Sequence, residues 1–309
     1  MRIKKFFQNF WLILKEAGIA FMDDNALKLS ASLSYYTVFA LAPLLIVVIS
    51  LLGIFYGQEA IQGEIYEQIN HLIGSSAALQ IQDMIKNVQV SGKSTMGAII
   101  GFGTLVFTAT GVFIEIQSSI NFIWSIRAKP KRGWFKFIQN RLLSFSLIIS
   151  MGFLLLVSLV ISTVLEVFNK KLEKLFSDFT VYIAYLFNYA LVIAVISVLF
   201  AIIFKVLPDG KLRWKDAFIG ASFTAFLFIV GKFLIGFYLG QSDVSGAYGA
   251  AGSVIVILLW VNYSSAILYF GAEFTKAYSQ HFGTPIEPAA HAVLVVKEET
   301  EHTTNVATR

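Results

Sequence analysis

Three ionisable side chains interrupt long apolar stretches of the sequence, where a charge is costly: Glu115, Lys232 and Glu273. A charged group at membrane depth has to face protein or water, so each is a candidate for a path across a membrane or for holding an anionic group. Each also has a structural interpretation. Lys232 can extend its ammonium to the outer headgroups, and Glu273 can be an ordinary acidic anchor at the interface.

Glu115 lies near the end of a stripe of small and polar residues. Their spacing of three or four positions places all of them on one face of a helix: Gly97, Gly101, Thr104, Thr108, Gly111, Glu115 and Ser118. In lipid, small residues let a second helix approach closely and hydroxyls bond across the contact. Two interpretations stay open: the stripe packs against another helix, or it lines a path for a substrate or ion.

A second polar stretch opens the first long apolar segment, at Ser34, Tyr35 and Tyr36. Pro43 follows and is expected to kink the helix, because proline removes one backbone hydrogen bond. The kink at Pro43 and the hydroxyl groups before it could together shape a cavity. Alternatively, the hydroxyls satisfy the freed carbonyls and hold helices together.

Further polar and small residues are assigned to helix packing. The amides of Asn121 and Asn262 are expected to bond between helices, although both are also candidates for the path. Gly249, Gly252 and Gly271 are expected to allow close packing near the two ends of the last apolar segment.

The elements that position these residues are predicted to be membrane-spanning helices. The chain is 57% hydrophobic and 14% charged, whereas soluble domains carry about 25% charged residues. Apolar runs close to the roughly 20 residues that a span needs occur at 30–55, 96–124, 142–165, 179–204, 217–239 and 248–271. The prediction is therefore an all-α polytopic membrane protein with six transmembrane helices in one membrane domain, 30–281.

Amphipathic and polar segments surround these spans. Residues 1–29 are predicted to form a helix in the inner interface, with an apolar face of Phe6, Phe10 and Leu14 beside basic residues. Residues 56–95 are expected to form an outer loop with short amphipathic helices. Residues 282–309, rich in Pro, Thr and Glu, are predicted to be a disordered tail.

The orientation follows from the basic residues. Most of the 24 Lys and Arg residues lie in the N-terminal segment, in 127–141, in 205–215 and towards the C-terminus. Cytoplasmic loops carry the excess of Lys and Arg, so both termini are predicted to be cytoplasmic. The same bias accounts for the net charge of +5 without a nucleic-acid partner.

Four stretches resemble the YihY/BrkB family of bacterial inner-membrane proteins: LKLSASLSYYTVFALAPLL (27–45), GFGTLVFTATGVFIEIQSSINFIW (101–124), VLPDGKLRWKDAFIGA (206–221) and YGAAGSVIVILLWVNYSSAILYFGAEFT (248–275). The resemblance implies six spans with both termini inside. Members have been discussed as envelope and serum-resistance factors and as transporters, and an older ribonuclease BN label also travels with the family.

The residues do not favour the ribonuclease label. The four histidines, His71, His281, His291 and His302, lie outside the predicted spans and in no metal-binding spacing. The chain has no cysteine and no phosphate-binding loop of the G-x-x-x-x-G-K-[ST] type. We therefore expect no enzyme, no metal and no cofactor.

The leading hypothesis is a transporter or flippase-like permease for an amphiphilic or anionic envelope component. Its partners would be membrane lipids and a lipid or small-molecule substrate, not nucleic acid. It rests on the stripe ending at Glu115, the polar start of the first span and Lys232. The alternative from another class is a non-transporting scaffold for envelope assembly.

Overall fold

The structure is a computed structural model that describes residues 2–56, 79, 95–129, 178–241 and 252–296. Its helices are α1 (Arg2–Asp23), α2 (Ala26–Tyr56), α5 (Thr95–Ile123), α7 (Asp178–Val206), α8 (Trp214–Gln241) and α10 (Gly252–His281). Its strands are short: β1 (Ile126–Ala128), β2 (Gly210–Lys211), β3 (Glu287–Pro288) and β4 (Ala292–Leu294). The mainly helical fold that the sequence predicts is confirmed.

Two of the described helices are long and apolar enough to cross a bilayer, over Trp214–Leu239 and Val254–His281. A shorter apolar helical segment covers Ala190–Val206. The total of six spans stays a prediction. The predicted span at 142–165 lies outside the described residues, as does most of the loop at 56–95.

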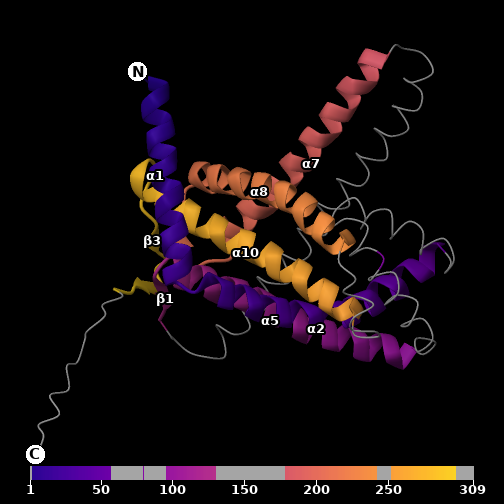
Figure 1. Cartoon of the computed structure of the whole chain (residues 1–309). Helices are drawn as coiled ribbons and strands as arrows, with labels where there is room; N and C mark the ends of the chain where they lie inside the picture. The colour runs from indigo at the N-terminus through magenta and orange to yellow at the C-terminus, as the bar shows by residue number, and fades with distance from the viewer. Residues whose placement is uncertain (1, 57–78, 80–94, 130–177, 242–251, 297–309) are drawn as a thin grey trace, which may run out of the picture.

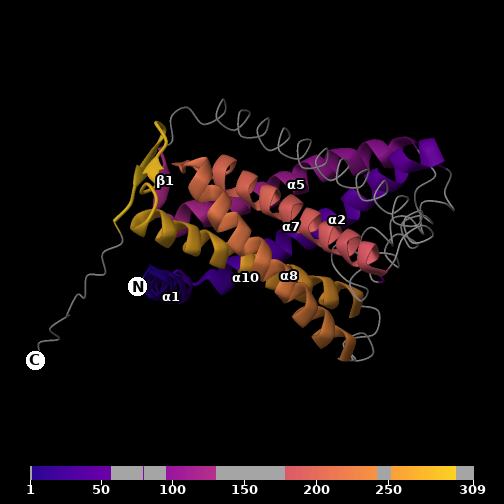
Figure 2. The ribbon, with the colours of Figure 1, turned by 90° about the horizontal axis from the view of Figure 1, so that it is seen from above.

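The helices pack as a bundle that gathers at one end (Figure 1). α2 lies beside α5 and α10, and α8 lies beside α10 and α7. All four strands lie at one end of the bundle, and α1 crosses it there; we call this the strand end (Figures 1 and 2). Its core takes residues from five helices: Ala26 of α2, Ile120 and Ile123 of α5, Phe204 of α7, Ala221 of α8 and Tyr269 of α10.

The contact between α8 and α10 depends on two glycines and two threonines in reciprocal positions. A Cβ atom at Gly220 of α8 would lie 1.9 Å from Thr275 Oγ1 of α10. A Cβ atom at Gly271 of α10 would lie 2.0 Å from Thr224 Oγ1 of α8. Each threonine also donates its hydroxyl to the glycine carbonyl four residues earlier in its own helix. The two backbones therefore approach closely at the level of these four residues.

The C-terminal segment folds back onto the strand end. β4 pairs antiparallel with β1, with Ile126 opposite Leu294, and β3 pairs antiparallel with β2, with Gly210 opposite Pro288. The prediction of disorder from residue 282 is therefore wrong for 282–296. The polar composition of this segment is offset by backbone pairing and by burial of Ala292, which is 7% exposed. Residues 297–309 lie outside the described part of the chain.

A tight turn joins α1 to α2. α1 ends at Asp23, and Asn25 adopts a φ of 51°, a left-handed conformation that asparagine tolerates. α2 then begins at Ala26, four residues before the span predicted from Ser30, so the predicted N-terminal segment 1–29 contains the start of the next helix.

Candidate functional site

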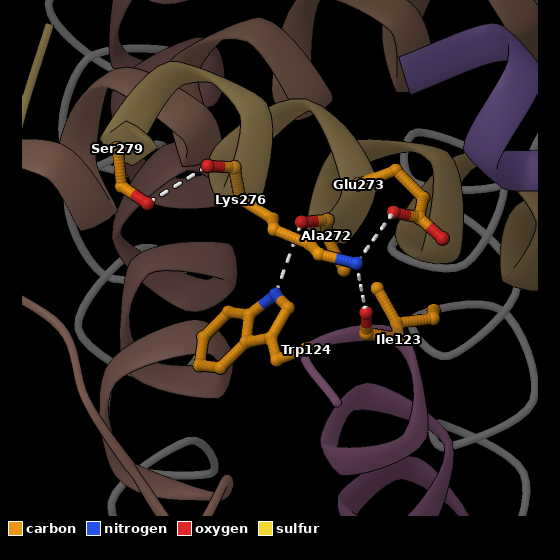
Figure 3. Close-up of polar contacts among 6 residues, drawn as sticks. All are labelled: Ile123, Trp124, Ala272, Glu273, Lys276 and Ser279. Carbon is orange, nitrogen blue, oxygen red and sulfur yellow. Dashed lines mark hydrogen bonds and ion pairs between the residues drawn. The ribbon is translucent and has the colours of Figure 1, made fainter. Parts of the chain in front are cut away.

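A fully buried carboxylate lies where α10 passes the end of α5. Glu273 is 1% exposed. Its Oε2 atom is 4.0 Å from Lys276 Nζ, which also donates to the Ile123 carbonyl at 2.6 Å (Figure 3). Trp124 Nε1 donates to the Ala272 carbonyl at 3.1 Å. These contacts fix the C-terminal end of α5 against α10 directly beside the carboxylate.

The burial of Glu273 corrects its interpretation as an ordinary interfacial anchor. Such an anchor extends its charge to water, whereas this carboxylate is enclosed by protein. A buried carboxylate is tolerated when a cation or hydrogen-bond donor accompanies it. Lys276, three residues further along α10, takes that position.

Polar groups of α5 and α10 form a layer next to Glu273. Tyr269, one helical turn before Glu273, is fully buried. Its hydroxyl lies beside the Ser119 side chain, and Glu115 is within electrostatic range of it. Glu115 and Ser119 are themselves one turn apart on α5. We call these four residues, Glu115, Ser119, Tyr269 and Glu273, the carboxylate layer.

The small and polar stripe of α5 does not form the buried face of that helix. Thr104 and Ser118 are exposed, and Thr108 and Glu115 are partly exposed. The buried face lies beside the stripe, and it carries Thr110, Ile116, Ser119, Ile120 and Ile123. Helix packing and a path for a substrate or ion were the two interpretations of the stripe, and the choice between them stays a prediction.

One stripe residue does contact a second helix. A Cβ atom at Gly111 would lie 3.1 Å from a ring carbon of Tyr36 in α2. Gly97 and Gly101 lie near the start of α5. At Gly111, the absence of a side chain therefore leaves room for the Tyr36 ring of α2.

The hydroxyl groups of α2 donate hydrogen bonds to backbone carbonyls of the same helix. Ser30, Ser34 and Thr37 each donate to the carbonyl four residues earlier, at 2.7–2.8 Å. Tyr35 and Tyr36 are 59% and 40% exposed, so their rings do not enclose an internal cavity. α2 continues as a helix through the buried Pro43 to Tyr56.

Lys232 lies far from the carboxylate layer. It is partly buried in α8, beside Gly231, whose Cβ atom would lie 2.1 Å from the Tyr263 hydroxyl. Gly220 contacts Thr275 near Glu273, and Lys232 is twelve residues further along α8, which at 1.5 Å per residue is about 18 Å. Asn262 is partly buried in α10, Gly252 begins α10, and Gly249 lies outside the described residues.

Sequence reasoning missed a polar cluster at the strand end. Asn121 forms its hydrogen bonds with the turn after α7 and not with another helix. Asn121 Nδ2 donates to Asp209 Oδ2 at 2.9 Å, and Asp209 N donates to Asn121 Oδ1 at 2.8 Å. His291 Nε2 lies 2.6 Å from Asp209 Oδ1. The Pro208-Asp209-Gly210 sequence indicates a turn, but nothing local indicates partners 82 and 88 residues away.

Metal binding finds no support in the described ranges. Nowhere in them do three or more His, Asp or Glu side chains come together as ligands for a metal ion.

The apolar helices and their packing define a helical membrane protein. The model of the virulence factor BrkB family matches residues 19–293, and the chain belongs to this family. Its curated relatives are named UPF0761 membrane proteins. The relative from Saccharophagus degradans is 28% identical over 262 residues, which cover 84% of this chain and 58% of the relative. That of Azotobacter vinelandii is 28% identical over 270 residues, 86% of this chain and 62% of the relative.

The chain therefore spans about three-fifths of the length of these relatives. Their names identify membrane proteins and no enzymatic activity. No solved structure matches the chain.

Proposed function

We propose that the chain is a flippase-like permease of the bacterial inner membrane that moves an amphiphilic envelope component between leaflets. The observation that supports this most is the outward-facing polar stripe of α5. Thr104 and Ser118 are exposed on a long, mainly apolar helix. Polar groups in lipid need polar partners. The Ser118 hydroxyl donates to the Glu115 carbonyl at 3.1 Å. A hydroxyl that donates can still accept a hydrogen bond from the headgroup of an amphiphile whose acyl chains stay in the bilayer.

The charged residues suggest what such a headgroup would meet. Glu115 belongs to both the stripe and the carboxylate layer and is partly exposed. Lys232 is on a different helix and about 18 Å from that layer. A headgroup with a phosphate would be attracted to Lys232, and one with an amine or hydroxyl could bond Glu115. We infer that an anionic or zwitterionic phospholipid-like molecule suits these two positions better than a free inorganic ion.

The test is transbilayer movement of lipid in vesicles that contain the purified protein. A trace of fluorescent phosphatidylglycerol or phosphatidylethanolamine is placed in both leaflets, and dithionite bleaches the outer leaflet. Replacing Thr104 and Ser118 together by leucine should slow bleaching of the inner pool by about tenfold, about 1.4 kcal/mol in barrier height. Phe107→Leu, an apolar change on the same exposed side of α5, is the matched control. Bleaching as slow as in protein-free vesicles for both lipids would contradict the proposal.

A scaffold for envelope assembly is the second candidate, and the close packing of α8 against α10 favours it. Glu115→Gln and Lys232→Ala separate the two in a deletion strain complemented with each variant. A permease predicts loss of function at normal membrane levels of the protein. A scaffold predicts full activity, because neither residue is part of the tight contact between Gly220, Thr224, Gly271 and Thr275.

A further inference from the structure

Helix α1 lies across the strand end of the bundle instead of running along it (Figure 1). The two-residue turn after Asp23 redirects the chain into α2, which runs along the bundle. If α2 follows the membrane normal, α1 follows the membrane surface. Its orientation about its own axis then decides which side chains meet lipid.

One side of α1 packs on the bundle. Ile13 and Ala17 are buried against Phe274 and Ala277 of α10. The Phe10 ring lies 6.0 Å from the ring of Phe274. This corrects the predicted lipid-facing side of the helix, because Phe10 contacts protein.

Two contacts show which side of α1 faces the span. Glu16 Oε2 lies 2.6 Å from Nε2 of His281, the last residue of α10. The Phe21 ring packs on Phe270, eleven residues earlier in α10, at 5.7 Å. The Glu16 side of α1 therefore points away from the span. At 100° per residue, Trp11 and Met22 lie roughly opposite Glu16, on the side nearer the bilayer.

The remaining surface of α1 carries large apolar side chains that the described helices leave exposed. Trp11 is 67% exposed, Met22 65%, Ile19 53% and Leu12 51%. Lys15 is exposed between them, one turn from Trp11 and one turn from Ile19. A face with a tryptophan, other large apolar residues and an adjacent lysine is typical of a helix that lies in a membrane interface.

We propose that α1 binds the surface of the leaflet at the strand end, with the side chains of Trp11 and Met22 inserted between headgroups and acyl chains. Lys15, exposed on the same helix next to these two residues, would contact anionic headgroups. The occupant is lipid and not a second copy of the chain, because the face combines apolar area with positive charge. This proposal does not depend on transport.

The test uses the absence of cysteine from the chain, which allows single nitroxide labels without further changes. Full-length Trp11→Cys and Met22→Cys variants are labelled and placed in vesicles of phosphatidylcholine with phosphatidylglycerol. We expect high accessibility to oxygen and low accessibility to a water-soluble nickel chelate at both sites. Asn9→Cys, exposed on the side of α1 nearer Glu16, is the matched control and should show high nickel accessibility.

High nickel accessibility at Trp11 and Met22 would overturn the proposal, because these side chains would then be in water. Low accessibility to both reagents would also overturn it, because the two side chains would then be covered by protein. In vesicles of phosphatidylcholine alone, the two labels should report a shallower position. Equal depth in the two kinds of vesicle would refute the assignment of Lys15 to anionic lipid.

Discussion

Asp209 connects three segments that are far apart in the sequence. Its side chain accepts a hydrogen bond from Asn121 at the end of α5 and lies against His291 in the C-terminal segment. Its own carbonyl accepts from the amide of Ala289 at 2.8 Å. Because Asp209 and Asn121 are both buried, neither can exchange its partner for water.

Removing this carboxylate should therefore destabilise the strand end. Asp209→Ala leaves the Asn121 amide without its acceptor and His291 without its partner, which should lower the free energy of unfolding by about 2–4 kcal/mol. The measurement is unfolding in detergent followed by intrinsic fluorescence. Glu287→Ala removes an exposed carboxylate from the same C-terminal segment and should change the stability little. Equal losses for the two variants would contradict the role given to Asp209.

The sequence predicts the environment of some residues better than that of others. Glu115 and Glu273 stand out because a charge inside an apolar run is rare, whatever surrounds it. The partners of Asn121 do not stand out, because the residues that bond it come from a turn and from the C-terminal segment. The sequence also did not predict whether the side chains of Thr104 and Ser118 face another helix or the surface. A periodic stripe shows that residues share a face, but not whether a neighbouring helix covers that face.

At the scale of elements, α8 and α10 approach closely because each offers a glycine to the other's threonine. Gly220 and Thr224 are four apart, as are Gly271 and Thr275, so the two pairs match when the helices run antiparallel. Without a hydrophobic driving force in lipid, such close van der Waals contact is a main source of helix association. The four residues thus hold α10 and its buried Glu273 in position.

A methyl group at this contact should separate the two helices. The added Cβ atom of Gly220→Ala would lie 1.9 Å from Thr275 Oγ1, so we expect a loss of about 1–3 kcal/mol in stability from overpacking. Gly236→Ala is the matched control on α8, because nothing lies within 4 Å of its Cβ position. It should be neutral or raise stability by up to about 1 kcal/mol through helix propensity. Thermal unfolding of the two purified variants measures the difference.

The C-terminal strands give a second test at this scale. Ala292→Asp places a carboxylate in the core of the strand end, where Ala292 is 7% exposed, and should cost several kcal/mol. Leu294→Asp changes the same strand at a side chain that is 58% exposed and should be tolerated. Limited proteolysis followed by mass spectrometry should show early cleavage between 282 and 296 only in the first variant. Early cleavage in the unmodified chain would contradict the pairing of β3 and β4.

Helices were predictable from this sequence and the strands were not, for a physical reason. A run of about 20 apolar residues has few alternatives in lipid, so α5, α7 and α8 begin and end within about three residues of their predicted bounds. The strands are two or three residues long and have no periodicity to detect. They form because the turns after α5 and α7 present backbone groups at the strand end, and composition alone does not reveal this pairing.

At the scale of the whole molecule, the strand end concentrates features that belong at a membrane surface. It holds α1, the four strands, and the exposed basic residues Arg127, Lys211, Arg213 and Lys215. The opposite ends of α8 and α10 are apolar. The excess of basic residues at the strand end predicts that this end is cytoplasmic.

This orientation can be tested with two cysteines on either side of α8. The helix has 28 residues, which at 1.5 Å per residue is about 42 Å, longer than a hydrocarbon core of about 30 Å. Lys211 precedes the helix at the strand end and Gln241 ends it, and both side chains are exposed. In intact cells, Gln241→Cys should react with a membrane-impermeant maleimide, and Lys211→Cys should react only after lysis. The unmodified chain, which has no cysteine, gives the background. The opposite labelling would reverse the orientation and place α1 and Asp209 on the outer side. Labelling of both sites from outside would show that α8 does not span the membrane.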